Sequence, residues 1–342
     1  MSRYLVIGGS SFIGAYTVQA LLDAGCEVDA TGRNAAFNDH YRSLGVGYSF
    51  FDLGTDDPFA VLPDRDYDGI VLLAALLPAN SSASLQDYDN AADYFTVNSA
   101  GTAQLLEWAR SKGVQRVIST TSYADVQRSW SGEMPIEEDW PRSFNFTGDH
   151  AAYVISKNAA CDIMQYYNEQ HGMHNVAFRL PPVYGVGPHN ELFVNGVRRL
   201  SGIARFIELA KRGEEITVFG DASLARDVVY VKDVAQAFVK ALGSEQAEGL
   251  YNIGSGRSTS LMEQAQVIAD VFSEDGKRSV VTLDASRPNG IQPYSMDIAK
   301  ARMDFGYEPQ FSDFSDMMRD WKLEEERDVY TELFSNNIER GH

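Results

Sequence analysis

Cysteine is nearly absent from this chain of 342 residues. Cys26 and Cys161 are its two cysteines, too few for a disulfide framework or a cysteine-based metal site. The six histidines show no ligand-like clustering, and no pair of carboxylates has a spacing that demands a metal. We therefore expect a reduced protein that holds no metal.

Positive charge is also scarce. Lys and Arg together number 29 against 48 Asp and Glu, which gives a net charge of −19. A surface that binds nucleic acid needs basic residues to neutralise phosphates, so this balance argues against a nucleic-acid partner. It also argues against adhesion to anionic membranes. An anionic substrate would need a local basic pocket inside this acidic protein.

Long apolar runs are missing as well. No run approaches the roughly 18 residues of a membrane-spanning helix. The N-terminal sequence MSRYLVIGG has one Arg and a short apolar stretch that stops at glycines, so it predicts a first strand and not a signal peptide. We expect a cytoplasmic protein with no membrane partner.

Short apolar runs alternate with helical periodicities through the first half of the chain. Strands are expected at residues 4–7, 27–31, 46–51, 70–73, 114–120 and 175–180, and helices at 12–24, 91–112 and 151–171. This alternation predicts right-handed βαβ units and the α/β class of fold, with a doubly wound parallel sheet of the Rossmann type.

The pattern changes after Pro181 and Pro182. A helix is expected at residues 203–212, a strand at 216–219, and a strand followed by a helix over 228–241. Residues 1–180 and about 226–250 are expected to form the Rossmann domain, with about 181–225 and 251–342 in a smaller, mixed α/β substrate-binding lobe. The charged tail around residues 321–330 predicts a solvated amphipathic helix.

A glycine-containing segment, GGSSFIG from Gly8 to Gly14, joins the first expected strand to the first helix. Gly8 permits a sharp turn and close approach of a phosphate, and Gly14 allows tight packing of the helix on the strand. The helix N-terminus then offers N–H groups and a positive dipole to phosphates. An ordinary βα turn is the alternative, but the position in a βαβ unit favours a dinucleotide site. Its expected contacts are Gly8, Ser10, Ser11, Phe12, Ile13 and Gly14.

The end of the second expected strand bears on the choice between NAD and NADP. NAD sites usually place an Asp or Glu there to accept from the ribose 2′-OH, but this chain has Thr31-Gly-Arg33-Asn34. Arg33 could pair with a 2′-phosphate, which favours NADP; alternatively it stacks on adenine or lies in solvent with NAD bound. Asp52 is a candidate acceptor for the adenine amino group or a helix cap, and it and Leu53 are included among the cofactor contacts.

Tyr153 and Lys157 form the candidate catalytic pair. They lie four residues apart in an expected helix, so they face the same way. A nearby ammonium favours the phenolate, which is expected to bring the tyrosine pKa down towards operating pH. Thr121 and Ser122 follow the strand expected at 114–120, at the sheet edge where α/β folds bind ligands, and either hydroxyl could bond a substrate oxygen.

These segments together resemble the NAD-dependent epimerase/dehydratase family of the extended short-chain dehydrogenase/reductases. The similar motifs are Gly8–Gly14, with Ser11 in place of the middle glycine of GxxGxxG; Leu73-Ala74-Ala75; Asn98 with Gly101-Thr102; Tyr153 and Lys157 as YxxxK; Arg179–Gly185; Phe219–Asp233; and Tyr251–Gly256. They span nearly the whole chain.

The resemblance implies roles for further residues. It assigns cofactor contacts to Leu73, Ala74, Ala75, Asn98, Lys157 and Pro181, and substrate contacts to Leu77, Ser122, Arg226 and Arg287. Tyr153 is expected to take a proton from a sugar hydroxyl while hydride passes to NAD(P), and Ser122 is expected to orient the substrate, with Thr121 as the alternate. Family members commonly dimerise through the helices expected here at 91–112 and 151–171, so a homodimer is expected.

Departures from the family pattern bear on the activity. Tyr123-Ala124 stands where the 4,6-dehydratases have Asp-Glu, which disfavours dehydration. Pro182 replaces an asparagine that often contacts substrate phosphates, which weakens the case for a conventional nucleotide sugar. The favoured function is epimerisation of a nucleotide-diphosphate sugar. The alternatives are an NADP-dependent dehydrogenase or reductase of a small alcohol or ketone, and a non-catalytic dinucleotide-binding protein.

Overall fold

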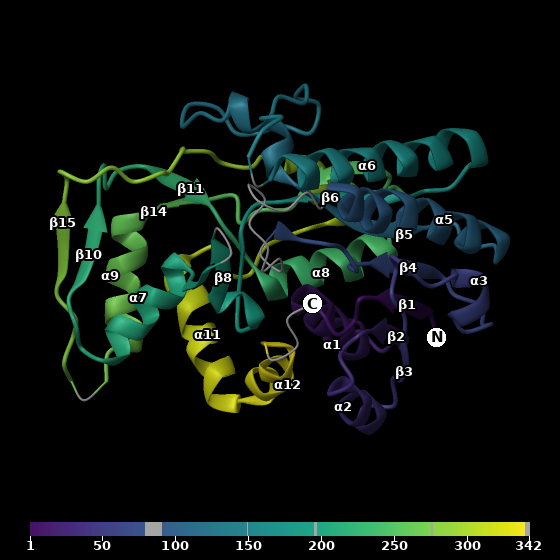
Figure 1. Ribbon diagram of the computed structural model, residues 1–342, viewed down its shortest axis with the longest axis horizontal. Coiled ribbons are helices and arrows are strands. Elements are labelled where there is room, and N and C mark those ends of the chain that lie inside the picture. Colours follow the sequence, from purple (N-terminus) through teal and green to yellow (C-terminus); the bar gives the residue numbers. More distant parts are fainter. Residues whose placement is uncertain (79–90, 149, 195–196, 275, 339–342) are drawn as a thin grey trace.

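Seven parallel strands form the central sheet of the computed structural model, which describes residues 1–78, 91–148, 150–194, 197–274 and 276–338 (Figure 1). The strands are β1 (Arg3–Ile7), β2 (Glu27–Gly32), β3 (Gly47–Phe50), β4 (Gly69–Leu72), β5 (Val117–Ser122), β6 (Val176–Leu180) and β13 (Gly249–Asn252). Their order is β13-β6-β5-β4-β1-β2-β3. The order reverses between β1 and β4, where sheets of this kind bind ligands at their carboxyl edge. The predicted Rossmann-type α/β class is confirmed.

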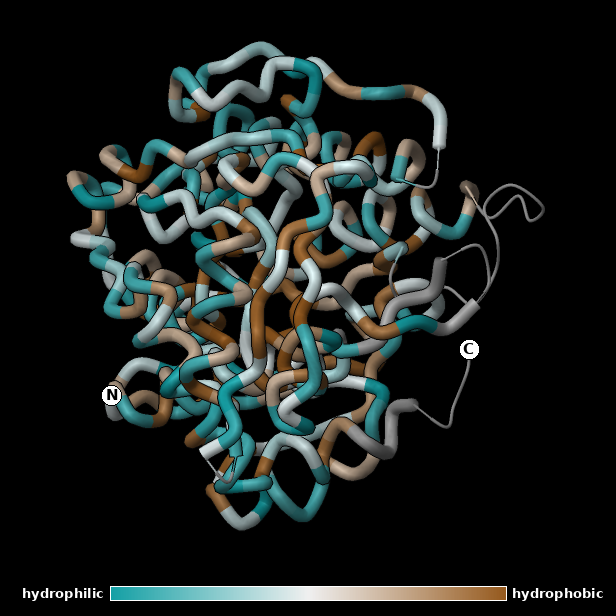
Figure 2. Tube along the Cα trace, turned by 90° about the vertical axis from the view of Figure 1, so that its left-hand side faces the viewer, coloured by the Kyte–Doolittle hydropathy of each residue, from teal (hydrophilic) through white to brown (hydrophobic). Residues whose placement is uncertain are grey.

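Helices cover both faces of this sheet (Figure 1). One face carries α1 (Phe12–Asp23) and α8 (Val231–Leu242), and the other carries α5 (Gly101–Ser111) and α6 (Ala151–His171). Because side chains alternate along a strand, Val6 belongs to the core under α1 and α8, whereas Leu5 and Ile7 belong to the core under α5 and α6. Figure 2 shows hydrophobic positions concentrated along these central segments.

The long helix expected at residues 91–112 is divided into three parts. These are α4 (Ala91–Tyr94), a π-helical segment (Phe95–Ala100) and α5. The π turn holds Asn98, whose side chain bonds to the backbone of Leu76. A widened turn inside a helix is frequent at functional sites, and periodicity alone did not predict it.

A second group of elements lies to one side of the sheet, on the left of Figure 1. It contains α7 (Gly202–Lys211), α9 (Leu261–Phe272) and α11 (Phe314–Arg327), with the pairs β10 (Ile216–Phe219) and β15 (Val281–Asp284), and β11 (Ala225–Asp227) and β14 (Ser258–Ser260). Shorter elements connect the rest: α2 (Phe37–Ser43), α3 (Pro58–Val61), α10 (Ala299–Phe305), the paired β7 (Val183–Tyr184) and β12 (Val229–Tyr230), the paired β8 (Glu191–Val194) and β9 (Val197–Leu200), and the 3₁₀ turns Tyr123–Ser129 and Pro188–Asn190.

The expected amphipathic helix around residues 321–330 is present up to Arg327, but it is less solvated than expected and does not continue to residue 330. The tail forms two helices, α11 and α12 (Val329–Ile338), separated at Asp328, which has a left-handed backbone with φ of 58°. Trp321, Tyr330 and Phe334 are buried against the rest of the molecule. Their neighbours are charged, so the composition suggested a solvated helix, whereas these aromatic side chains determine how the tail packs.

Membrane spans, metal sites and disulfides can each be checked in the described residues. No helix in the described part of the chain is both long and apolar enough to cross a membrane. The same residues contain no group of three His, Cys, Asp or Glu side chains arranged to hold a metal ion. Both Cys26 and Cys161 are free thiols.

Candidate active site

The loop between β1 and α1 has the close contacts of a phosphate cradle. Gly8 has φ of +88°, and a Cβ there would lie 2.5 Å from the backbone nitrogen of Ala74. A Cβ on Gly14 would lie 2.1 Å from the carbonyl oxygen of Gly8. Ser11 caps α1, because its Oγ accepts from the Gly14 N–H at 3.2 Å, and the first turn of α1 carries no acidic residue. The helix therefore presents an uncompensated positive end next to a tight glycine loop, which fits a bound pyrophosphate.

Other predicted cofactor contacts lie around this loop. Ser10, Phe12 and Pro181 are buried, and Ile13 is half-buried in the first turn of α1. Leu53 is buried and packs against Gly101, where an added Cβ would lie 2.7 Å from the Leu53 side chain.

At the end of β2, Arg33 is already paired. Its Nη1 donates to Asp52 Oδ2 at 3.2 Å, and its side chain is 63% exposed. Asp52 Oδ1 accepts from the Gly54 N–H at 2.9 Å. The Arg33 guanidinium, which was expected to bind a 2′-phosphate, is thus bound to the carboxylate of Asp52. The geometry does not support the predicted preference for NADP.

Asn98 holds the loop that follows β4. Its Oδ1 accepts from the Leu76 N–H at 2.8 Å, and its Nδ2 donates to the Leu76 carbonyl at 3.1 Å and to Ser156 Oγ at 3.0 Å. Both side-chain amide protons are thus used within the chain, and the side chain of Asn98 holds this loop in position.

The same loop contains several expected contacts. The N–H groups of Leu73 and Ala74 both donate to the Ile7 carbonyl, which fixes the loop against β1. Ala75 and Leu77 follow, half-buried, just before residues 79–90, which lie outside the described part.

The candidate catalytic pair lies in the first two turns of α6. Lys157 is 4% exposed, and burial lowers its pKa to about 8. Burial raises the pKa of the Tyr153 phenol well above its usual value, and the nearby Tyr94 adds to the rise. The chain alone therefore favours the neutral phenol and does not lower the pKa of Tyr153 as expected, although Lys157 is still largely protonated near neutral pH. A phenolate at this position needs further positive charge close to the ring.

The two candidate hydroxyls point to opposite faces of β5. Thr121 is on the face covered by α6, where it is 4% exposed and lies beside Cys161. Ser122 is on the other face, and its Oγ accepts from the Ala124 N–H at 3.2 Å as the cap of a 3₁₀ turn. Within the described residues, neither hydroxyl is hydrogen-bonded to Tyr153. The Ser122 proton remains available to a substrate oxygen.

A buried ion pair anchors the 3₁₀ turn after Ser122. Arg179 Nε and Nη2 both donate to Asp125 Oδ2, at 3.1 and 2.9 Å, and both side chains are almost fully buried. Asp125 therefore has a structural role, which ties the end of β5 to β6.

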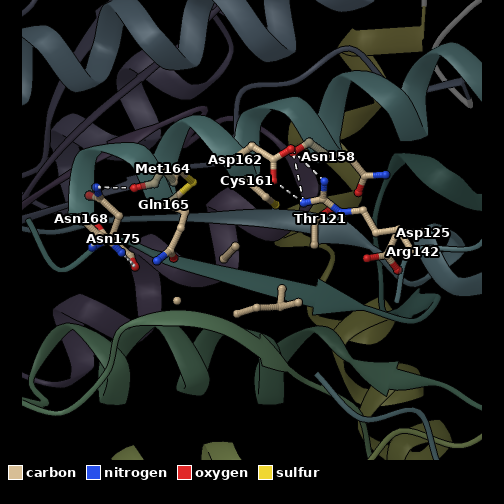
Figure 3. A pocket seen from close by; sticks show the side chains of 13 residues that line it. Thr121, Asp125, Arg142, Asn158, Cys161, Asp162, Met164, Gln165, Asn168 and Asn175 are labelled. Carbon is tan, nitrogen blue, oxygen red and sulfur yellow. Dashed lines mark hydrogen bonds and ion pairs between the residues drawn. The ribbon is translucent and has the colours of Figure 1, made fainter. Parts of the chain in front are cut away.

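Behind this ion pair is a cavity of about 170 Å³ under α6 (Figure 3). Its wall includes Thr121, Asp125, Arg142, Asn158 and Cys161, but neither Tyr153 nor Lys157. The cavity therefore adjoins the catalytic helix and does not include the catalytic pair.

Arg226 has no carboxylate partner in the described structure. Its Nη2 is 3.5 Å from the Tyr184 hydroxyl, its Nε is buried without a hydrogen bond, and Tyr123 and Tyr294 lie nearby. Arg287 is exposed, and its guanidinium lies 4.1 Å from the centre of the Phe219 ring. Tyr294 follows Arg287 in the same segment and pairs with Arg226 in a β-bridge. The segments that carry the two arginines are therefore neighbours.

An aromatic cluster beside Arg226 was missed by the sequence analysis. The ring of Tyr123 stacks on Trp130 at 4.7 Å, and the Tyr294 ring lies 4.8 Å from Trp130. Tyr123 and Trp130 belong to one short segment, but Tyr294 lies more than a hundred positions further along the chain, so no local pattern predicted that it would join them. Aromatic faces next to an unpaired cation are suited to a planar base or a sugar ring.

This fold and this site define an enzyme of the extended short-chain dehydrogenase/reductase class. The sequence model of the NAD dependent epimerase/dehydratase family matches residues 4–254, and the chain belongs to that family. The UDP-glucose 4-epimerase of Mycolicibacterium smegmatis is 29% identical over 315 residues, covering 90% of this chain and 94% of the relative.

Other relatives have related activities. The UDP-glucuronic acid decarboxylase 1 of Xenopus tropicalis is 27% identical over 310 residues, covering 90% of this chain and 68% of its own. The solved structure of Thermus thermophilus UDP-glucose 4-epimerase in complex with NAD has a TM-score of 0.70 and 26% identity, covering 96% of this chain and 99% of that one. The resemblance inferred from the motifs is thus confirmed.

Proposed function

We propose that this enzyme is an NAD-dependent epimerase of a nucleotide-diphosphate sugar. The observation that carries the proposal is Arg226, a cation with a buried and unpartnered Nε among tyrosines. A guanidinium without a carboxylate partner in an acidic protein is suited to an anionic ligand. Its parallel N–H groups can donate to two oxygens of a diphosphate at once. Arg287, stacked on Phe219, is proposed as a second, outer contact.

NAD, and not NADP, is the proposed cofactor. The loop around Gly8 and Gly14 fits a dinucleotide, because a Cβ at either position would collide with the neighbouring backbone and change the tight turn that leads into the N-terminus of α1. Arg33 is paired with Asp52, so a 2′-phosphate would compete with that carboxylate for the guanidinium and lie close to its negative charge. When bound, the nicotinamide supplies hydride acceptance and return. Titration should show tighter binding of NAD; tighter binding of NADP would refute this choice.

Tyr153 is proposed as the group that holds the proton taken from the sugar hydroxyl. Its neutral phenol is favoured by burial, so the phenolate requires positive charge nearby. Lys157, one turn further along α6, supplies an ammonium that is still largely protonated near neutral pH. The proton would rest on the phenol oxygen and be returned from it to the sugar oxygen.

Either Ser122 or Thr121 is proposed to orient the substrate hydroxyl. Ser122 has its proton free but already accepts from Ala124, whereas Thr121 lies on the side of α6. The variants Ser122→Ala and Thr121→Val remove one hydroxyl each with little change in volume. The variant with the larger loss of kcat identifies the catalytic hydroxyl, and equal wild-type activity in both would exclude the role.

Turnover of a panel of nucleotide sugars tests the activity. An epimerase regenerates its cofactor, so product should form without a lasting change in the absorbance of reduced nicotinamide. A stoichiometric change on a small alcohol or ketone would instead support net oxidation or reduction, the alternative that Pro182 favours. Product formation by Tyr153→Phe at the wild-type rate would exclude Tyr153 as the group that takes the proton.

Two further predictions remain proposals. The first is the division into a Rossmann domain and a substrate-binding lobe. The second is a homodimer formed through the long helices, on which Phe95 and Tyr166 are exposed large side chains. Sedimentation of the purified chain checks the second, and a monomer at assay concentration would refute it.

A further inference from the structure

The C-terminal hairpin, α11 followed by α12, crosses from the second group of elements to the first two helices of the sheet domain (Figure 1). Its first helix is fixed to α8 by Lys232, whose Nζ lies 2.7 Å from Asp320 and 2.9 Å from Glu324. The Tyr230 hydroxyl donates to Asp320 at 2.7 Å. These partly buried contacts hold α11 in place and set the starting point of α12.

The second helix packs its aromatic side chains on the dinucleotide-binding side of the molecule. Tyr330 is 9% exposed, and its ring lies 4.3 Å from that of Tyr16 in α1. Phe334 is 2% exposed, and its ring lies 5.7 Å from that of Phe37 in α2. Removing α12 would expose Tyr16 and Phe37, both of which are buried.

One hydrogen bond ties α12 directly to the residue after Arg33. Asn34 Nδ2 donates to the Leu333 carbonyl at 3.1 Å, and Asn34 Oδ1 accepts from the Ala36 N–H at 3.0 Å. Asn34 follows β2, the position where Rossmann folds contact the adenosine ribose. The tail therefore fixes the backbone at the adenosine end of the proposed cofactor site.

A second connection runs from α12 to the phosphate loop. The Phe37 ring, which meets Phe334, lies 5.2 Å from the ring of Tyr41. The Tyr41 hydroxyl donates to the Gly9 carbonyl at 2.6 Å and is buried. Gly9 belongs to the glycine loop, so three aromatic rings and one hydrogen bond link the C-terminal helix to the pyrophosphate cradle.

We propose that α12 is a cofactor-positioning element, with Tyr330, Phe334 and the Leu333 carbonyl holding the adenosine half of the dinucleotide site in its binding shape. The inference rests on the proposed dinucleotide site and adds to it the part played by the tail. Without α12, ligand binding would have to order residues 34–41. The conformational entropy lost in that ordering would weaken the binding of the ligand. The sugar-nucleotide side, around Arg226, makes none of these contacts and would be unaffected.

The test titrates the full chain with ADP, as a probe of the adenosine half, and with UDP, as a probe of the substrate side. In Phe334→Ala the dissociation constant for ADP should rise by about fivefold or more, while that for UDP changes by less than about twofold. Phe334→Leu should recover most of the ADP affinity. Leu323→Ala removes an exposed side chain from α11 and is the matched control, with both constants unchanged.

Two results would overturn the proposal. Unchanged ADP affinity in Phe334→Ala would show that α12 does not support the site, and an equal weakening of ADP and UDP would show a general loss of structure. Tyr330→Ala provides a second variant if Phe334→Ala does not fold. A wild-type chain that binds UDP but no ADP would instead refute the dinucleotide site itself.

Discussion

Arg226→Met should stabilise the protein while it weakens the binding of a nucleotide diphosphate. Arg226 places a positive charge among several tyrosine side chains. Its Nε is buried and has no hydrogen-bond partner. A buried donor without a hydrogen bond costs about 1–3 kcal/mol. Methionine retains most of the apolar stem and removes the charge. Because part of the guanidinium is accessible, a gain of about 1 kcal/mol in the free energy of unfolding is expected.

The loss in affinity follows from the same group. A hydrogen bond to a charged group contributes about 1.5–3 kcal/mol, and each 1.4 kcal/mol is tenfold in the dissociation constant. UDP binding should therefore weaken by roughly 10- to 150-fold. Urea unfolding of the ligand-free chain and calorimetric titration with UDP measure the two effects separately.

Arg179→Met is the matched control, because it removes a second buried arginine that does have a partner. It leaves Asp125, which is 3% exposed, without its counter-ion. Breaking a buried pair in this way costs about 3–5 kcal/mol, so this variant should be destabilised. Destabilisation of Arg226→Met to a similar extent, or an unchanged affinity for UDP, would refute the reasoning.

Three other predictions concern the cofactor loop and the catalytic pair. Gly14→Ala should lose ADP and NAD binding, since the new Cβ would fall 2.1 Å from the Gly8 carbonyl oxygen; unaltered NAD affinity would contradict the cradle. Tyr153→Phe should lower kcat by about 10²- to 10⁴-fold with an unchanged circular dichroism spectrum, and retention of kcat would exclude Tyr153 as the proton acceptor. The pKa of Lys157 is lowered to about 8, so the unfolded chain binds more protons above that pH, and stability from this group should rise between about pH 8 and 10.5. Urea unfolding should show that rise in the wild type and not in Lys157→Met; the same slope in both would show that folding does not lower the pKa of Lys157.

Local sequence indicated the parallel sheet and the glycine loop. Most strands and the long helices of the first half carry their own periodicity, and right-handed crossovers convert such a series into one parallel sheet. The order of the strands and the addition of β13 came only from the structure. The steric demand for glycine at positions 8 and 14 is a property of the backbone itself, so the motif was evident before the fold. The four-residue spacing that places Tyr153 and Lys157 on one helical face is local for the same reason.

Tertiary structure decided the charge state of the site and the packing of the tail. Arg33 and Asp52 are 19 positions apart, Arg179 and Asp125 are 54 apart, and only their meeting shows which arginines are paired. Burial raises the pKa of Tyr153 where the sequence suggested a lowering, because desolvation depends on what surrounds the helix and not on its own residues. Phe334 lies at the far end of the chain from Phe37, and their contact brings the C-terminal helix to the proposed adenosine site.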